Sequence, residues 1–426
     1  MSISSLTRIG TANAYAFTLQ NLQSQQASLS NLQNELSSGK KITSASDDPA
    51  GAAAAERALT RLNRIATDQR ALDAQKNTVT SAESTLGDVT SALQSIRTLV
   101  VNAGDAIQTP ADRKTIATQI QGLRDQIFAL ANAKDSNGLP LFGGLGSAQS
   151  PFVGPNSSGA DYVYNGLSGQ GTSTTTAIPA TIDGARAFMS QPATDGIYNV
   201  TVGNPTSSTG GIPNSRTLTT SGITVTNSTL VNGSAYTLNV TGVDSTTVPG
   251  TTTVTYDITE NPNVGGPYTG ITASYPSNAT GNFTVTAMPG LSMTVTGTPA
   301  VGDTMTVTPS SSLFTTLDKA ITDIGSAADP NAVTQAVGQA LHNIDLGLAQ
   351  VSAARGLAGT LMNRAAVITT ANDARTLQEQ TDKSNAENID MVKTISDFQS
   401  QQTSYSAALQ SYAQIQKLSL FNYING

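Results

Sequence analysis

The sequence predicts an α+β multidomain protein: an antiparallel α-helical coiled-coil rod formed by both chain ends, with a central all-β insertion. Three observations predict this plan. Apolar residues recur at seven-residue spacing near both ends of the 426-residue chain. Between about 139 and 312 lysine is absent, Gly, Pro and Thr are concentrated, and short runs alternate apolar and polar residues. The chain also exceeds the usual size of one domain, about 100–200 residues.

The first predicted helix contains an apolar row at seven-residue spacing, made of Tyr15, Leu22, Leu29 and Leu36. A more polar row follows each of the first three by four residues, at Leu19, Gln26 and Gln33. Such a seam pairs with another helix, and its polar positions weaken the pairing while helping to set its register. Gly39 is expected to end the helix, because glycine favours the position just past a C-cap. Segment 1–40 is therefore predicted to be a terminal assembly helix.

Segment 41–140 is predicted to be the N-terminal part of the helical rod. Asp47, Asp48 and Pro49 mark the start of a long helix, since Asp is a favoured N-cap and Pro is tolerated in the first turn. Six apolar residues then keep strict seven-residue spacing: Ile65, Leu72, Val79, Leu86, Leu93 and Val100. A further helix opens at Thr109 and Pro110 and ends in a turn at 135–138.

Segment 141–312 is predicted to be mainly β, as one or two antiparallel sandwich or barrel-like domains. The clearest predicted strands are Ile197–Val202, Ala235–Val240, Thr253–Ile258, Asn282–Ala287, Met293–Val295 and Met305–Val307. Turn signals such as Asn232-Gly233 and Pro289-Gly290 separate them. Short strands with frequent turns favour antiparallel architectures.

Helices are predicted again in segment 313–384, the C-terminal part of the rod, and in segment 385–426, the C-terminal assembly helix. The last helix has a row of Met391, Phe398, Tyr405 and Tyr412, with Ile395, Gln402, Leu409 and Gln416 as the companion row. We expect the first row to pair with the row from Tyr15 to Leu36, and these eight residues are the predicted assembly interface. Ordering such weak seams costs more conformational entropy than their burial returns. Both ends are therefore expected to be disordered in the free protein and to order on assembly.

Composition excludes several classes of partner. Charged residues make up 12% of the chain and the formal net charge is −7, which offers phosphate backbones and anionic lipids little to bind. Nucleic acid and membranes are thus not expected as partners. Cysteine is absent, so no disulfide or thiolate metal site is predicted. The first residues lack the apolar core and cleavage site of a secretory signal peptide.

No pattern predicts catalysis, a metal site or a cofactor. His342 is the single histidine, and a general base needs an orienting partner that the sequence does not show. Asp47 and Asp48 are interpreted as helix caps rather than half of a metal site. The glycines in 143–146 predict a hinge, since no Lys-bearing helix follows them. Arg355 lies at an otherwise apolar seam position, so it either has a carboxylate or carbonyl partner or extends to solvent.

Three further segments carry distinctive motifs: 36–51, 351–356 with Asn363 and Arg364, and 417–424. These segments resemble the flagellin-like axial proteins of bacteria. Segment 36–51 is similar to the SSGxxIxSAxDDPAG linker of that family, and 351–356 with Asn363 and Arg364 is similar to its VSxxRxxxG…NR helix. Segment 417–424 resembles the SLFDYL tail of the family's hook-filament junction members rather than the end of flagellin. The resemblance covers roughly 1–190 and 311–426.

The resemblance implies a non-enzymatic structural subunit, located outside the cell in the flagellum. It implies export through the flagellar type III system and assembly as a ring of copies between the first hook-associated junction protein and the flagellin filament. An export chaperone is a further partner that it allows. Two alternatives stay open: a flagellin filament subunit, and a surface adhesin whose Thr-rich sheet binds while the helices anchor.

Overall fold

The chain is described from a computed structural model that covers residues 3–146, 149–155, 161–191, 194–203, 218–262, 265–278 and 280–424. It divides into two compact units. The terminal unit comprises Met1–Arg70 and Thr369–Gly426, and the central unit comprises Ala71–Ile368. The α+β class predicted from the sequence is confirmed.

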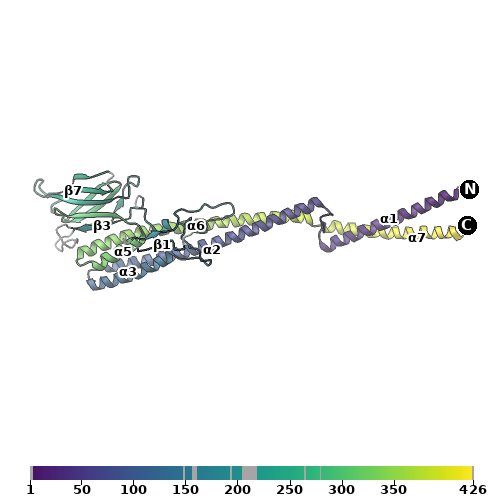
Figure 1. Ribbon diagram of the computed structural model, residues 1–426, viewed down its shortest axis with the longest axis horizontal. Helices are drawn as coiled ribbons and strands as arrows, with labels where there is room; N and C mark the ends of the chain where they lie inside the picture. Colours follow the sequence, from purple (N-terminus) through teal and green to yellow (C-terminus); the bar gives the residue numbers. More distant parts are fainter. Residues whose placement is uncertain are drawn as a thin grey trace. The chain divides into compact units, whose positions relative to one another are not determined.

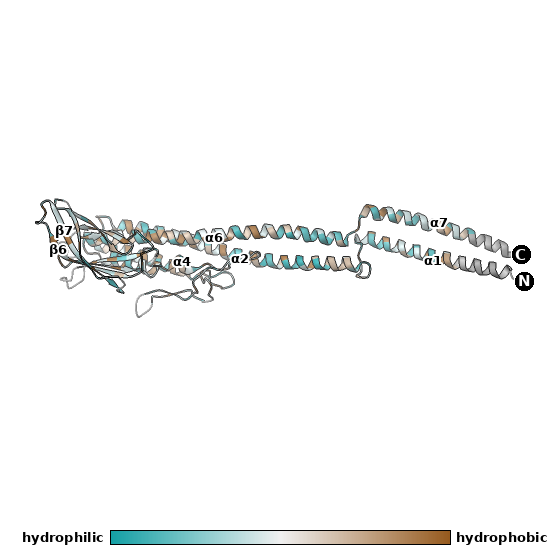
Figure 2. Ribbon diagram, turned by 90° about the horizontal axis from the view of Figure 1, so that it is seen from above, coloured by the Kyte–Doolittle hydropathy of each residue, from teal (hydrophilic) through white to brown (hydrophobic). Residues whose placement is uncertain are grey.

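The helices follow the predicted order around the β region. Their bounds are α1 Ile3–Ser38, α2 Pro49–Ala103, α3 Pro110–Ala131, α4 Gly184–Phe188, α5 Leu313–Ser326, α6 Pro330–Glu387 and α7 Met391–Ile424. In the terminal unit α1 packs along α7, and the two run side by side in both views (Figure 1 and Figure 2). The chain's two ends therefore meet as one helix pair.

The linker that follows α1 and the linker that follows α6 are hydrogen-bonded to each other. Gly39 follows α1 with φ 69° and donates its N–H to the Glu35 carbonyl at 2.8 Å, which is the C-cap expected from the sequence. The Lys41 N–H then donates to the Glu387 carbonyl at 2.8 Å, and the Ile389 N–H donates to the Gly39 carbonyl at 3.3 Å. The two linkers thus form one small backbone junction within the terminal unit.

The helical core of the central unit lies along α2 and α6. Leu72, Val79, Leu86, Leu93 and Val100 are each 0% exposed, so the predicted seven-residue row faces this core. Helix α3 packs on α5 and begins with a capping box, in which Thr109 and Asp112 each accept a hydrogen bond from the other's backbone N–H. The aromatic rings of Phe142, Phe152, Phe188 and Phe314 close the same core.

Two antiparallel sheets enclose a second core within the central unit. One sheet has the order β3-β11-β6-β7-β8; in the other, β10 pairs with β4, β5 and β9. The strands are β3 Tyr198–Gly203, β4 Thr219–Thr220, β5 Thr224–Val225, β6 Ala235–Asp244, β7 Thr251–Asn261, β8 Tyr268–Pro276, β9 Gly281–Met288, β10 Leu291–Gly297 and β11 Thr304–Pro309. We call this part, 197–310, the β body. A separate hairpin pairs β1 Phe152–Val153 with β2 Val163–Tyr164.

Residues 141–189 contain less sheet than the sequence suggests. Besides the short hairpin they form α4, and their buried side chains join the helical core rather than the core of the β body. Phe142 and Phe152 pack edge-on against Phe188, and Phe152 also packs against Phe314 of α5, so these rings tie the segment to the helical core.

Amide side chains of α6 hold the β body. The Gln335 amide donates to the Thr220 hydroxyl at 2.8 Å, and Gln339 and Asn343 both donate to the Tyr198 carbonyl, at 2.9 and 3.1 Å. His342 Nε2 lies 2.8 Å from the Ile223 carbonyl oxygen. The histidine therefore has a backbone partner, in line with the non-catalytic interpretation.

Candidate assembly interfaces

The predicted seam residues lie on α1 and α7 of the terminal unit. Leu22 is buried, and Leu29, Leu36, Phe398, Tyr405 and Tyr412 are half-buried. Met391, at the start of α7, is 46% exposed. The side chain of Tyr15 lies outside the described residues. The described residues of both predicted rows therefore lie between α1 and α7, except for Met391.

The companion rows differ from the prediction. On α7 the covered positions alternate by four and three residues: Thr394, Phe398, Gln401, Tyr405, Ala408 and Tyr412. On α1 they are Thr18, Leu22, Gln25, Leu29, Leu32 and Leu36. The predicted companions Ile395, Leu409 and Leu19 are exposed. The physical reason is that a seven-residue row can pair with the row three or four positions away, and the small Ala408 permits closer helix approach than Leu409.

This phase leaves five large apolar side chains exposed on the two helices. They are Phe17 and Leu19 on α1 and Val392, Ile395 and Leu409 on α7, with exposures from 39% to 81%. The three on α7 lie on one side of that helix, whereas Phe17 and Leu19 lie about 200° apart around α1. Large apolar side chains on one side of a helix mark a candidate interaction surface. We call the three residues on α7 the outer stripe.

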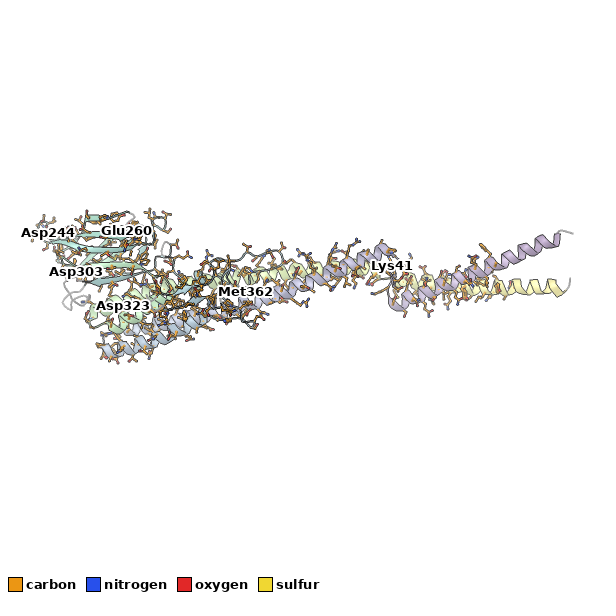
Figure 3. All side chains as sticks on the ribbon, in the orientation of Figure 1. Lys41, Asp244, Glu260, Asp303, Asp323 and Met362 are labelled. Carbon is orange, nitrogen blue, oxygen red and sulfur yellow. The ribbon has the colours of Figure 1, made fainter. Side chains whose placement is uncertain are left out.

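The loop at 40–48 is organised by its carboxylates. Asp47 accepts hydrogen bonds from the backbone N–H groups of Ser44 and Thr43, at 2.7 and 3.0 Å, and these bonds lower its pKa. Asp48 accepts the Gly51 N–H at 3.0 Å and so caps α2, which lowers its pKa as well. The capping interpretation is confirmed for Asp48. Lys41 lies 3.6 Å from Asp48 and is labelled in Figure 3.

Arg355 has the carboxylate partner that its seam position requires. Its Nη2 and Nε atoms lie 2.6 and 3.1 Å from Glu83 Oε1 on α2. The side chain is also 40% exposed, so pairing and solvent contact occur together. A second pair, Arg97 with Asp345 at 2.8 Å, links the same two helices further along. The two pairs show that α2 and α6 run antiparallel in the central unit.

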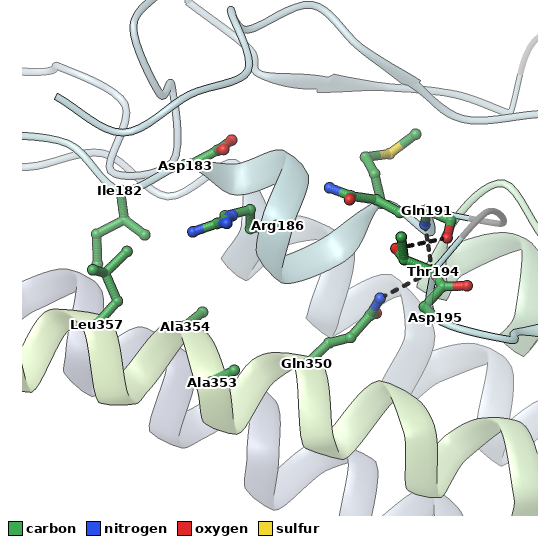
Figure 4. Close-up of a pocket in the computed structure, with 11 residues that line it drawn as sticks. Ile182, Asp183, Arg186, Gln191, Thr194, Asp195, Gln350, Ala353, Ala354 and Leu357 are labelled. Atoms are coloured by element: carbon green, nitrogen blue, oxygen red, sulfur yellow. Dashed lines mark hydrogen bonds between the residues drawn. The ribbon is translucent and has the colours of Figure 1, made fainter. Parts of the chain in front are cut away.

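A cavity of about 340 Å³ lies between α6 and the α4 region (Figure 4). Its lining is Ile182, Asp183, Arg186, Met189, Gln191, Thr194, Asp195, Gln350, Ala353, Ala354 and Leu357. The Asp195 carboxylate accepts N–H groups of Gln191, Ile197 and Gln350, while burial raises its pKa. No sequence pattern indicates this cavity, because its walls come from segments far apart in the chain.

The described ranges contain no group of three or more His, Cys, Asp or Glu side chains placed to hold a metal ion. Within the same ranges, the search for a helix apolar enough over a sufficient length to cross a bilayer found none. Carboxylates buried in the β body, such as Glu260 (Figure 3), accept local hydrogen bonds from Asn232 and the Gly265 N–H.

Comparison with known proteins identifies similar chains. Residues 9–147 match the bacterial flagellin N-terminal helical region. Over 148 residues the chain is 35% identical to flagellar hook-associated protein 3 of Salmonella typhimurium (strain LT2), covering 34% of this chain and 46% of that protein. It is 31% identical over 133 residues to phase 1 flagellin of Salmonella naestved, covering 31% of this chain and 26% of that protein. The chain thus spans about half the length of the first of these relatives, 46%, and less of the second.

A solved structure shows the likeness over more of the chain. The flagellar junction protein FlgL of Legionella pneumophila superposes with a TM-score of 0.56 at 25% identity. The superposition covers 73% of this chain and 99% of that chain.

Proposed function

We propose that this chain, a flagellin-like structural protein similar to flagellar hook-associated protein 3, is the junction adaptor between the hook-associated zone and the flagellin filament. It is exported by the flagellar type III system and acts outside the cell as part of the flagellum. Its partners are further copies of itself in a ring, the first hook-associated junction protein and flagellin, with an export chaperone before assembly.

The observation that carries this proposal is the α1/α7 pair with its outer stripe. A helix pair formed from both chain ends, with apolar groups such as Val392 (81% exposed) left outside, needs neighbouring subunits to cover it. The seam itself contains glutamine and small residues, so neighbours add stability that one chain lacks. This is the behaviour expected of a subunit that orders on assembly.

The alternative function is that of a flagellin filament subunit, which would use the same helix pair for assembly. The C-terminal segment 417–424 and the higher identity to hook-associated protein 3 than to flagellin, 35% against 31%, favour the adaptor. The two functions differ in number of copies, since an adaptor forms a bounded ring and a filament subunit polymerises without limit.

Deletion of the chain in its host tests the proposal. Hooks that lack filaments, together with flagellin released into the medium, are the expected result; restoring the full chain should restore filaments. Normal filaments after deletion would refute the proposal. Bare hooks without any released filament protein would instead identify the chain as the filament subunit.

A further inference from the structure

The terminal unit contains an open pocket of about 390 Å³ beside the junction of its two linkers. Half of its lining is apolar: Ile42, Ala45, Ala52, Ala55 and Leu59. The other half is polar: Lys40, Thr43, Ser44, Glu56 and Glu387. Ile42 and Ala55 are buried, so they form the floor, whereas most of the polar residues are exposed and form the rim. We call this site the linker pocket.

The polar groups of the rim bind one another or nearby groups of the same chain. Lys40 lies 3.3 Å from the Glu387 carboxylate, and the two hydroxyl groups of the lining each donate to Asp47 at 3.0 Å. The remaining charge, Glu56, is exposed, and an ion pair with an exposed carboxylate adds little stability. The buried floor, in contrast, suits an aliphatic side chain, because removal of such a group from water is favourable.

The outer stripe of α7 presents aliphatic side chains at the same level of the terminal unit. Val392 and Ile395 are 81% and 39% exposed, and they lie on the flank of α7, on average about a quarter turn or more from the seam. Val392 comes three residues after Ile389, whose N–H donates to the Gly39 carbonyl. The linker pocket begins at Lys40, directly after Gly39. The two linkers also lie beside each other in both views (Figure 1 and Figure 2).

We propose that Val392 and Ile395 of one copy enter the linker pocket of the next copy. This rests on the proposed ring of copies. Two complementary surfaces at one level of the same chain form a heterologous contact, which closes into a ring when the rotation between neighbours divides a full turn. In such a ring every pocket and every pair of aliphatic groups is covered. A different partner protein would cover one of the two surfaces and leave the other exposed to water.

Disulfide cross-linking tests the contact in flagella purified from the deletion strain that carries the full-length variant. The chain contains no cysteine, so introduced cysteines form only the bonds under test. Val392→Cys together with Ala45→Cys should give dimers and larger multimers after mild oxidation, and either change alone should give none. Val367→Cys with Ala45→Cys is the control, because Val367 is an exposed valine, at 59%, outside the terminal unit. It should stay monomeric.

A charge in the contact tests its importance for assembly. Val392→Asp should weaken each contact roughly tenfold, because an aliphatic group is lost and a carboxylate meets the apolar floor. The fraction of hooks that bear filaments, counted by electron microscopy, should fall accordingly. Val392→Leu keeps an aliphatic side chain and should support filaments. Val367→Asp should leave the fraction unchanged. Export and circular dichroism of each variant show that it folds.

Several outcomes overturn the contact. One is the absence of multimers from oxidised flagella whose filaments are normal, and another is a disulfide that forms within single chains in dilute solution. Where Ala45→Cys itself impairs filaments, Ala52→Cys takes its place, since it also lines the pocket. A photo-activated cross-linker on Val392→Cys should attach to residues 40–59 of a second copy, and attachment to a different flagellar protein would refute the pairing. Filaments that survive deletion of the whole chain would instead refute the junction function itself.

Discussion

Replacement of Phe398 and Tyr405 by Asp should separate the α1/α7 pair while leaving the rest of the chain folded. Both side chains are half-buried in the seam. Complete burial of a large apolar side chain contributes about 1.5–3 kcal/mol, so two half-buried residues together lose ~2 kcal/mol. At about 1.4 kcal/mol per factor of ten, the pairing equilibrium shifts by ~30-fold towards separated helices.

Circular dichroism and filament counts measure this effect. The double variant should keep the helical signal and the cooperative melting of the central unit, yet fail to support filaments. Ile395→Asp with Leu409→Asp is the matched control on the same helix, because these residues lie in the outer stripe. It should leave helicity nearly unchanged, as exposed substitutions do, yet still block incorporation. Normal filaments with the Phe398 and Tyr405 double variant would refute the role of the seam in assembly. Normal filaments with the control variant would refute the role of the outer stripe.

Further predictions concern the linkers and ion pairs. Gly51→Ala should lower the melting temperature of the terminal unit, because a Cβ there would lie 2.6 Å from Asp48 Oδ2 and would displace the carboxylate from the position in which it caps α2. The lowered pKa values of Asp47 and Asp48 mean that their contribution to stability is complete above the ordinary Asp pKa of about 3.9 and is lost as pH falls through the lower folded values. Melting from pH 7 to pH 2.5 should therefore be less pH-dependent in the double Asn variant, and Ca²⁺ or Mg²⁺ should leave melting of the parent unchanged. Arg355→Ala should cost about 1 kcal/mol, since the pair is partly solvated; a loss no larger than in an exposed-site control would contradict its role. Limited proteolysis of the free protein should trim both ends first, and full resistance at both would contradict their ordering on assembly.

Regular periodicity determined how much of the fold could be predicted. The row from Leu72 to Val100 repeats strictly and its members face one core, so the pattern and the packing agree. The seams of α1 and α7 were predicted in place but with the wrong companion rows, because Gln25 and Gln26 are equally polar and the sequence cannot show which one faces the partner helix.

Some parts of the structure have no recognisable pattern in the local sequence. Strand β8 was not predicted, because at this exposed edge of the sheet most of its residues are Thr, Ser, Gly or Ala and the apolar alternation is lost. The cavity around Arg186 depends on tertiary contact between 182–195 and 350–357. A lone arginine in a five-residue helix is no more conspicuous in the sequence than any other surface cation.

The way the β body joins the helical core explains why the family resemblance stops and resumes around it. Strands β3 and β11 pair in register from Tyr198 with Pro309 to Gly203 with Thr304, so the chain enters and leaves the body side by side. The pairing continues towards the core, where the Ser190 N–H donates to the Ser311 carbonyl at 3.0 Å. A segment whose two ends already meet adds no loop-closure cost to the core when its length changes. The helical core can therefore keep its packing while the inserted body varies in size, which is why 190–310 shows no recognisable motif beside strongly patterned helices.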